Sequence, residues 1–169
     1  KFPMLSMYLK NRQLLLELGP ELDRAVSYDG EMDHLRLDER QAEAMAKRLI
    51  DKNVWLYYLA GFDHGDLLRA MYQQAEPYSH FVVAEHDRRM LRTALEAKDF
   101  TDIMKSGRVF VLRESARLDT IKALERLGDL PNRRLKVIPP RSRRDSEWQM
   151  EMAKVFQECN DTLRTGLIT

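Results

Sequence analysis

The sequence has little cysteine, almost no net charge and no long apolar run. The single cysteine, Cys159, excludes an internal disulfide and a zinc site made of cysteines alone, and is typical of a reducing compartment. The 28 Lys and Arg residues nearly balance the 27 Asp and Glu residues, so the net charge is +1 and attracts neither nucleic acid nor an anionic membrane over long range. No stretch reaches the ~18 apolar residues of a membrane span, and the N-terminus lacks the pattern of a signal peptide. We therefore expect a cytoplasmic protein with no nucleic-acid or membrane partner.

The composition is that of a globular protein. Hydrophobic residues make up 44% and charged residues 33% of the 169 residues, which is enough for one domain with a single core. We find no internal repeat and no low-complexity tract. The chain starts at Lys1-Phe2-Pro3 without a methionine and stops at Leu167-Ile168-Thr169, so we expect it to be part of a longer protein.

Residues 1–52 are predicted to form a helical extension. The expected segments are a helix over Met4–Leu18 stopped by Gly19-Pro20, a short helix over Glu21–Val26, an extended piece over His34–Leu37, and a helix from its cap at Asp38 to about Asp51.

Residues 53–140 alternate short apolar runs with helical patterns, which predicts a Rossmann-like α/β domain with a mostly parallel sheet. The expected strands are Val54–Ala60, Phe81–Ala84, Val109–Leu112 and Leu135–Ile138. The expected helices between them run from Leu67 to Pro77, from the cap at Asp87 through Leu95, and from the cap at Ser115 to Gly128.

Residues 141–169 are predicted to be a connector helix toward a catalytic domain that this chain does not contain. Its apolar stripe is Trp148, Met152, Val155, Phe156, Cys159 and Leu163, which places the Cys159 thiol in a core and not in a nucleophilic site.

In such a sheet, ligands bind beyond the carboxyl ends of the strands. Two glycines in the loop after the first strand would let a phosphate or carboxylate approach the backbone, and an acid ending the second strand would hold a ribose. The candidate nucleotide crevice is Gly61, Asp63, His64, Gly65, Glu85 and Asp87. A dinucleotide fingerprint would have glycine at Asp63, so S-adenosylmethionine, which has no phosphate, fits this loop better. The cofactor stays open: a nucleotide-sugar, or none in this chain.

A structural interpretation of the same residues has equal weight. Glycines at both ends of a strand–helix turn, followed by an acid that caps a helix, are also what a tight turn requires. The four histidines show no metal-binding spacing, so we expect no metal site.

One basic cluster departs from the even charge of the chain. It consists of Arg133, Arg134, Lys136, Arg141, Arg143 and Arg144. Such a run is most often a solvated face, and the alternative is a surface for an acidic or phosphate-rich partner.

Several short motifs in order resemble one family. They are Met4-Leu5-Ser6-Met7-Tyr8-Leu9-Lys10-Asn11, Tyr57-Tyr58-Leu59-Ala60-Gly61-Phe62-Asp63-His64-Gly65, Val82-Val83-Ala84-Glu85-His86-Asp87, Asp99-Phe100 and Arg108-Val109-Phe110. Together they resemble the N-terminal region of the motility-associated factor (Maf) glycosyltransferases of bacteria. The resemblance implies an accessory domain, without catalytic residues of its own, in an enzyme that attaches nonulosonic acids to flagellin. Its implied partners are flagellin and the downstream catalytic domain of the same protein.

Two other functions stay open. A class I methyltransferase would use Glu85 to hold the adenosyl ribose, but the first strand ends in Leu59-Ala60, where those enzymes carry an acid. A non-enzymatic docking module would bind flagellin or another protein through the basic cluster.

Overall fold

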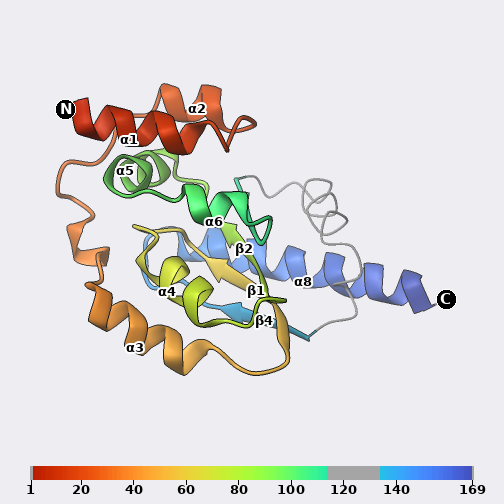
Figure 1. The fold of residues 1–169 in the computed structure, drawn as a ribbon. Coiled ribbons are helices and arrows are strands. Elements are labelled where there is room, and N and C mark those ends of the chain that lie inside the picture. Colours follow the sequence, from red (N-terminus) through yellow and green to blue (C-terminus); the bar gives the residue numbers. More distant parts are fainter. Residues whose placement is uncertain (1, 114–133, 169) are drawn as a thin grey trace.

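The structure, a computed structural model, describes residues 2–113 and 134–168, the last seven of them as backbone only. Four parallel strands form one sheet in the order β3-β2-β1-β4 (Figure 1). The strands are β1 (Val54–Ala60), β2 (His80–Ala84), β3 (Val109–Leu112) and β4 (Arg134–Ile138). The helices are α1 (Phe2–Arg12), α2 (Gly19–Asp23), the 3-10 turn η1 (Asp33–Leu35), α3 (Glu39–Leu49), α4 (Asp66–Gln74), α5 (Arg88–Ala97), α6 (Thr101–Lys105) and α8 (Ser146–Ile168). The predicted α/β, Rossmann-like fold is confirmed.

Strand β1 is apolar along its length because it lies inside the sheet and is covered on both faces. Tyr57 pairs with Phe81 of β2, and Tyr58 pairs with Val82 of β2 and Val137 of β4. Alternate side chains of β1 point to opposite faces of the sheet, as the two-residue repeat of a strand requires. Tyr57 lies in the core on one face, and Tyr58 lies in the core on the other.

Helices cover the two faces of the sheet unequally. Helices α1, α3, α4, α5 and α6 supply the core on the Tyr57 face, where Tyr8 of α1 and Phe100 before α6 are both buried. Helix α8 crosses the opposite face and buries Met152, Phe156 and Cys159 against it (Figure 1). The chain is therefore a three-layer α/β/α arrangement, in which α8 belongs to the outer layer on the second face.

The strand order reverses at β1. The chain moves outward from β1 through α4 to β2 and then to β3, whereas β4 lies on the other side of β1. The carboxyl ends of β1 and β4 thus form the switch point at which a Rossmann-like sheet offers a crevice.

Three sequence predictions near the N-terminus are wrong in detail. Helix α1 ends at Arg12, six residues early, because the chain then makes successive tight turns that bring Leu15 and Leu18 onto the core. The second helix begins and ends earlier than predicted, with Pro20 in its first turn. The first half of the extended piece over His34–Leu37 is instead part of the 3-10 turn η1, in which Leu35 is buried, while Arg36 is extended as predicted.

Elsewhere, the four strands and the helices capped by Asp38 and Asp87 are confirmed, whereas α6 was not predicted. The helix expected after Ser115, and Arg133 of the basic cluster, lie outside the described residues.

Candidate functional site

The switch-point crevice is small. It lies beyond the carboxyl end of β1, between Gly61 and Asp63 on one side and the loop 139–145 after β4 on the other, and it has a free volume of about 20 Å³. A site for a drug-sized ligand or cofactor typically has about 300–1,000 Å³. The crevice therefore has room for about one water molecule.

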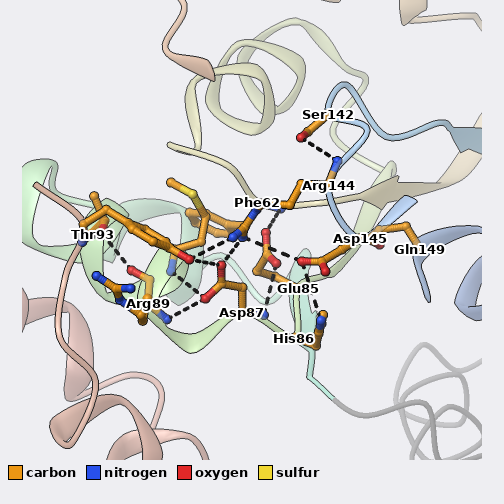
Figure 2. Close-up of polar contacts among 12 residues, drawn as sticks. Phe62, Glu85, His86, Asp87, Arg89, Thr93, Ser142, Arg144, Asp145 and Gln149 are labelled. Carbon is orange, nitrogen blue, oxygen red and sulfur yellow. Dashed lines mark hydrogen bonds and ion pairs between the residues drawn. The ribbon is translucent and has the colours of Figure 1, made fainter. Parts of the chain in front are cut away.

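Glu85, the first residue after β2, lies at the bottom of the crevice and is only 4% exposed. Its carboxylate accepts hydrogen bonds from the N–H of Phe62, at 3.1 Å, and of Asp87, at 3.2 Å (Figure 2). Burial raises the pKa of Glu85 to about 7, and the charges of Asp63 and Asp87 act in the same direction, while the two N–H groups lower it. The carboxylate thus ties the loop after β1 to the loop after β2.

Asp63 follows β1 in the left-handed conformation, with φ of 50°, and points toward the loop 139–145. Its carboxylate forms an ion pair with Arg141 at 3.4 Å. Burial raises the pKa of Asp63, and Arg141 partly offsets that rise. Arg141 also donates to the carbonyl of Leu35, at 3.1 Å, so it joins η1 to the same site.

Asp87 has two roles. One carboxylate oxygen caps α5 by accepting from the N–H groups of Arg89, at 3.0 Å, and Met90, at 3.3 Å. The other accepts from the hydroxyl of Tyr28, at 2.7 Å, and forms an ion pair with Arg144 (Figure 2). Arg144 donates in turn to the Tyr28 hydroxyl at 2.8 Å. The second acid of the predicted crevice is therefore occupied by protein groups.

Helix α8 closes the crevice from the second face of the sheet. Gln149 is 3% exposed and donates to the carbonyl of Ala84, at 3.1 Å, while its own carbonyl oxygen is buried and has no hydrogen-bond partner among the described residues. Next to it, the ring of His86 packs on Trp148 with centroids 4.2 Å apart, and His86 lies 3.6 Å from Asp145. These contacts fasten α8 to the loop after β2.

The structure brings four of the six predicted site residues together and directs the other two away. Gly61, Asp63 and Glu85 line the crevice, and Asp87 lies at its rim. His64 is buried and its ring nitrogen lies 2.8 Å from the carbonyl of Met32; burial lowers the pKa of its ring. Gly65 packs against Phe100, so its positive φ of 79° and its lack of a side chain serve packing and not ligand binding.

The basic cluster does not form one surface. Lys136 binds Asp51 at 2.7 Å, and Arg141 turns into the crevice. Arg144 pairs with Asp87 at the rim but stays exposed, as do Arg134 and Arg143. Sequence reasoning thus missed the residues that close the site, chiefly Arg141, Arg144 and Gln149. The only sequence signal for the two arginines was the local excess of positive charge, which does not indicate where each side chain points.

The arrangement of these side chains is typical of a structural role and is poorly suited to catalysis or ligand binding. Three buried or half-buried carboxylates are matched by two arginines and several N–H groups, and each oxygen of Glu85 accepts from the backbone. In the part of the chain that the structure describes, no three His, Cys, Asp or Glu side chains gather as metal ligands would. Within the same residues, no helix has the length and apolar character needed to cross a bilayer.

Fold and site together define an α/β protein with a Rossmann-like sheet whose switch-point crevice is filled by its own side chains. Comparison of the chain with protein-family models, curated proteins and solved structures gives no significant match.

Proposed function

We propose that this chain is a non-catalytic accessory domain of a Maf-type glycosyltransferase that attaches nonulosonic acids to flagellin in the cytoplasm of a bacterium. The motifs quoted above support the family, and the Rossmann-like fold agrees with it. In this proposal the domain orients flagellin or the catalytic domain and holds no nucleotide of its own.

The observation that carries the accessory role is the occupied crevice. A nucleotide entering beside Gly61 would have to displace Arg141 from Asp63 and Arg144 from Asp87, and would still meet Glu85 with both oxygens already accepting N–H groups. It would also need more than ten times the free volume that remains. The space beside Gly61 is thus too small for the usual ligand of the fold.

The same observation weighs against the methyltransferase alternative. That activity requires an accessible acid for the adenosyl ribose, and Glu85 is 4% exposed. The docking alternative is compatible with the accessory role, although Arg141 and Arg144 of the basic cluster are already paired with Asp63 and Asp87.

Calorimetry on this chain tests the proposal. Titration with cytidine monophosphate, uridine diphosphate and S-adenosylmethionine is expected to give no binding at millimolar concentration, whereas unglycosylated flagellin or the catalytic domain is expected to bind. Micromolar binding of S-adenosylmethionine would overturn the accessory role in favour of a methyltransferase. Absence of binding to both protein partners would remove the Maf assignment.

Binding of flagellin should be examined with Arg143→Glu and not with charge reversal at Arg141 or Arg144. Arg143 is exposed, so its reversal changes only the surface. Reversal at either of the other two arginines places a carboxylate against Asp63 or Asp87 and destabilises the fold, which would imitate a loss of binding.

A further inference from the structure

Residues 139–145, which connect β4 to α8, form one wall of the switch-point crevice. We call this segment the strap. Arg141 pairs with Asp63, and Arg144 pairs with Asp87 (Figure 2). None of the strap residues belongs to either apolar core of the described chain. The strap is thus held in place by polar side-chain contacts, which water can replace.

Three other walls of the crevice belong to regular secondary structure. Ala60 ends β1, Met90 lies in α5 and Gln149 lies in α8, and all three residues are buried. Displacing any of them would break backbone hydrogen bonds of a strand or a helix, whereas displacing the strap breaks mainly side-chain contacts. The strap therefore opens more easily than these walls.

The closed crevice contains one more carboxylate than it has arginines to pair with. Arg141 and Arg144 are each paired with an aspartate, whereas the carboxylate of Glu85 accepts only backbone N–H groups among the described residues. An ionised Glu85 at 4% exposure is thus a buried charge with no cation bound to it. It needs water, and the closed crevice has room for about one molecule.

Charged and titratable groups lie around Glu85 on several elements. They are Asp63 after β1, His86 and Asp87 after β2, Arg113 after β3, and Arg141, Arg144 and Asp145 in the strap. The lining residues of α5 and α8, Met90 and Gln149, are uncharged. Arg113 donates to the main-chain carbonyls of Glu85 and His86, so it does not neutralise the carboxylate. Histidine is the residue type whose charge ordinarily changes near neutral pH, so a test must separate His86 from Glu85.

We propose that the strap is a pH-sensitive switch, which closes the crevice while Glu85 is protonated and opens to water when Glu85 loses that proton to the solvent. In the open state Glu85, Asp63 and Asp87 are all hydrated, so no unpaired charge remains buried. The open chain also presents Arg141 and Arg144 to the solvent. This inference goes beyond the proposed function and does not depend on the sugar chemistry.

The direction of the pH dependence follows from the two states of Glu85. Burial gives it a pKa of about 7 in the closed crevice, against an ordinary value of 4.5, so the closed state binds the proton more tightly. Opening therefore releases a proton and becomes more favourable as the pH rises from about 4.5 to about 7. Below that range both states are protonated, and above it both are ionised, so the opening equilibrium is level on either side.

Limited proteolysis with trypsin between pH 6 and pH 8 tests the proposal on the whole chain. Cleavage after Arg141 requires its side chain to leave Asp63 and enter the protease, so the rate follows the population of the open strap. Cleavage after the exposed Lys52 is the internal reference, because it cancels the pH dependence of trypsin itself. The ratio of the two rates is expected to rise about tenfold from pH 6 to pH 8, as the pKa of Glu85 requires. Cleavage after Arg92, within α5, reports unfolding of the whole domain and should stay slow.

Glu85→Gln cannot ionise, so its rate ratio should stay constant over this range. Glu147→Gln, at an exposed carboxylate in the first turn of α8, is the matched control and should keep the tenfold rise. His86→Gln should keep it as well. The proposal would be overturned by a constant ratio in wild type, by an equal rise in Glu85→Gln, or by loss of the rise in either His86→Gln or Glu147→Gln. Cleavage after Arg92 as fast as cleavage after Arg141 would overturn it too, since the whole domain and not the strap would then open.

Discussion

The ionisation of Glu85 provides a direct test of how closed the crevice is. Its pKa is about 7 in the folded protein, against an ordinary value of 4.5. Since one pKa unit corresponds to about 1.4 kcal/mol, the full difference corresponds to about 3 kcal/mol. The folded state keeps its proton to higher pH than the unfolded state does, so the free energy of unfolding falls as the pH rises from 4.5 through 7.

Replacement of Glu85 by glutamine isolates this effect. Glutamine does not titrate, so the stability of wild type minus that of Glu85→Gln should fall by about 2–3 kcal/mol between pH 5 and pH 8. Glutamine also loses one acceptor for the N–H of Phe62 or Asp87, but that cost is the same at each pH. The measurement is urea unfolding of both proteins at half-unit pH intervals.

The subtraction removes shared carboxylates that do not interact with Glu85, whereas the part of the Asp63 and Asp87 titration that is coupled to Glu85 stays in the difference. Asp23 and Asp99 have lowered pKa values, mainly because Arg12 and Lys10 bind them. Their protonation therefore destabilises the folded protein only in more acid solution. A difference between wild type and Glu85→Gln that does not vary with pH would mean that the carboxylate of Glu85 is hydrated, and the closed crevice would no longer support the accessory role.

Three further substitutions test the packing around the site. Gly65→Ala places a methyl group 2.5 Å from the ring of Phe100 and should cost about 3 kcal/mol or more in urea unfolding, whereas Gly107→Ala, at a similar φ but with nothing within 4 Å, should cost about 1 kcal/mol. Asn11 is fully buried, and Asn11→Leu removes the two hydrogen bonds that its side chain donates and the one that it accepts, all at 2.8 Å. This variant should lower the free energy of unfolding by about 2–4 kcal/mol. A loss below about 1 kcal/mol would contradict the role of Asn11 in joining α1 to α5. Asp87→Ala loses both the cap of α5 and the ion pair, so by thermal melting it should be less stable than Asp87→Asn, which keeps a capping side chain; equal stabilities would show that the cap contributes nothing.

Much of the fold could be predicted from the sequence because its signals are local. The run Val54–Ala60 is apolar throughout, which is typical of a strand covered on both faces, and Asp38 and Asp87 cap helices with side chains that reach only two or three residues along the chain. Helix α6 was missed because five residues carry too little periodicity to be distinguished from a loop.

Part of the candidate site followed from topology. The carboxyl ends of parallel neighbouring strands meet at one edge, so Gly61 and Glu85 were expected to lie together and do. His64 and Gly65 were included only because they are adjacent in sequence, and the turn they occupy directs them toward Met32 and Phe100 instead.

The sequence by itself determined the strands, the principal helices and the edge of the sheet where the acids collect. Only the tertiary structure decided that this edge is closed, since Arg141 reaches Asp63 across 78 residues and Arg144 reaches Asp87 across 57. Residue type and spacing specify charge but not the direction of a long side chain, nor the loss of water that raises the pKa of Glu85. Both depend on packing between segments that are distant in the chain.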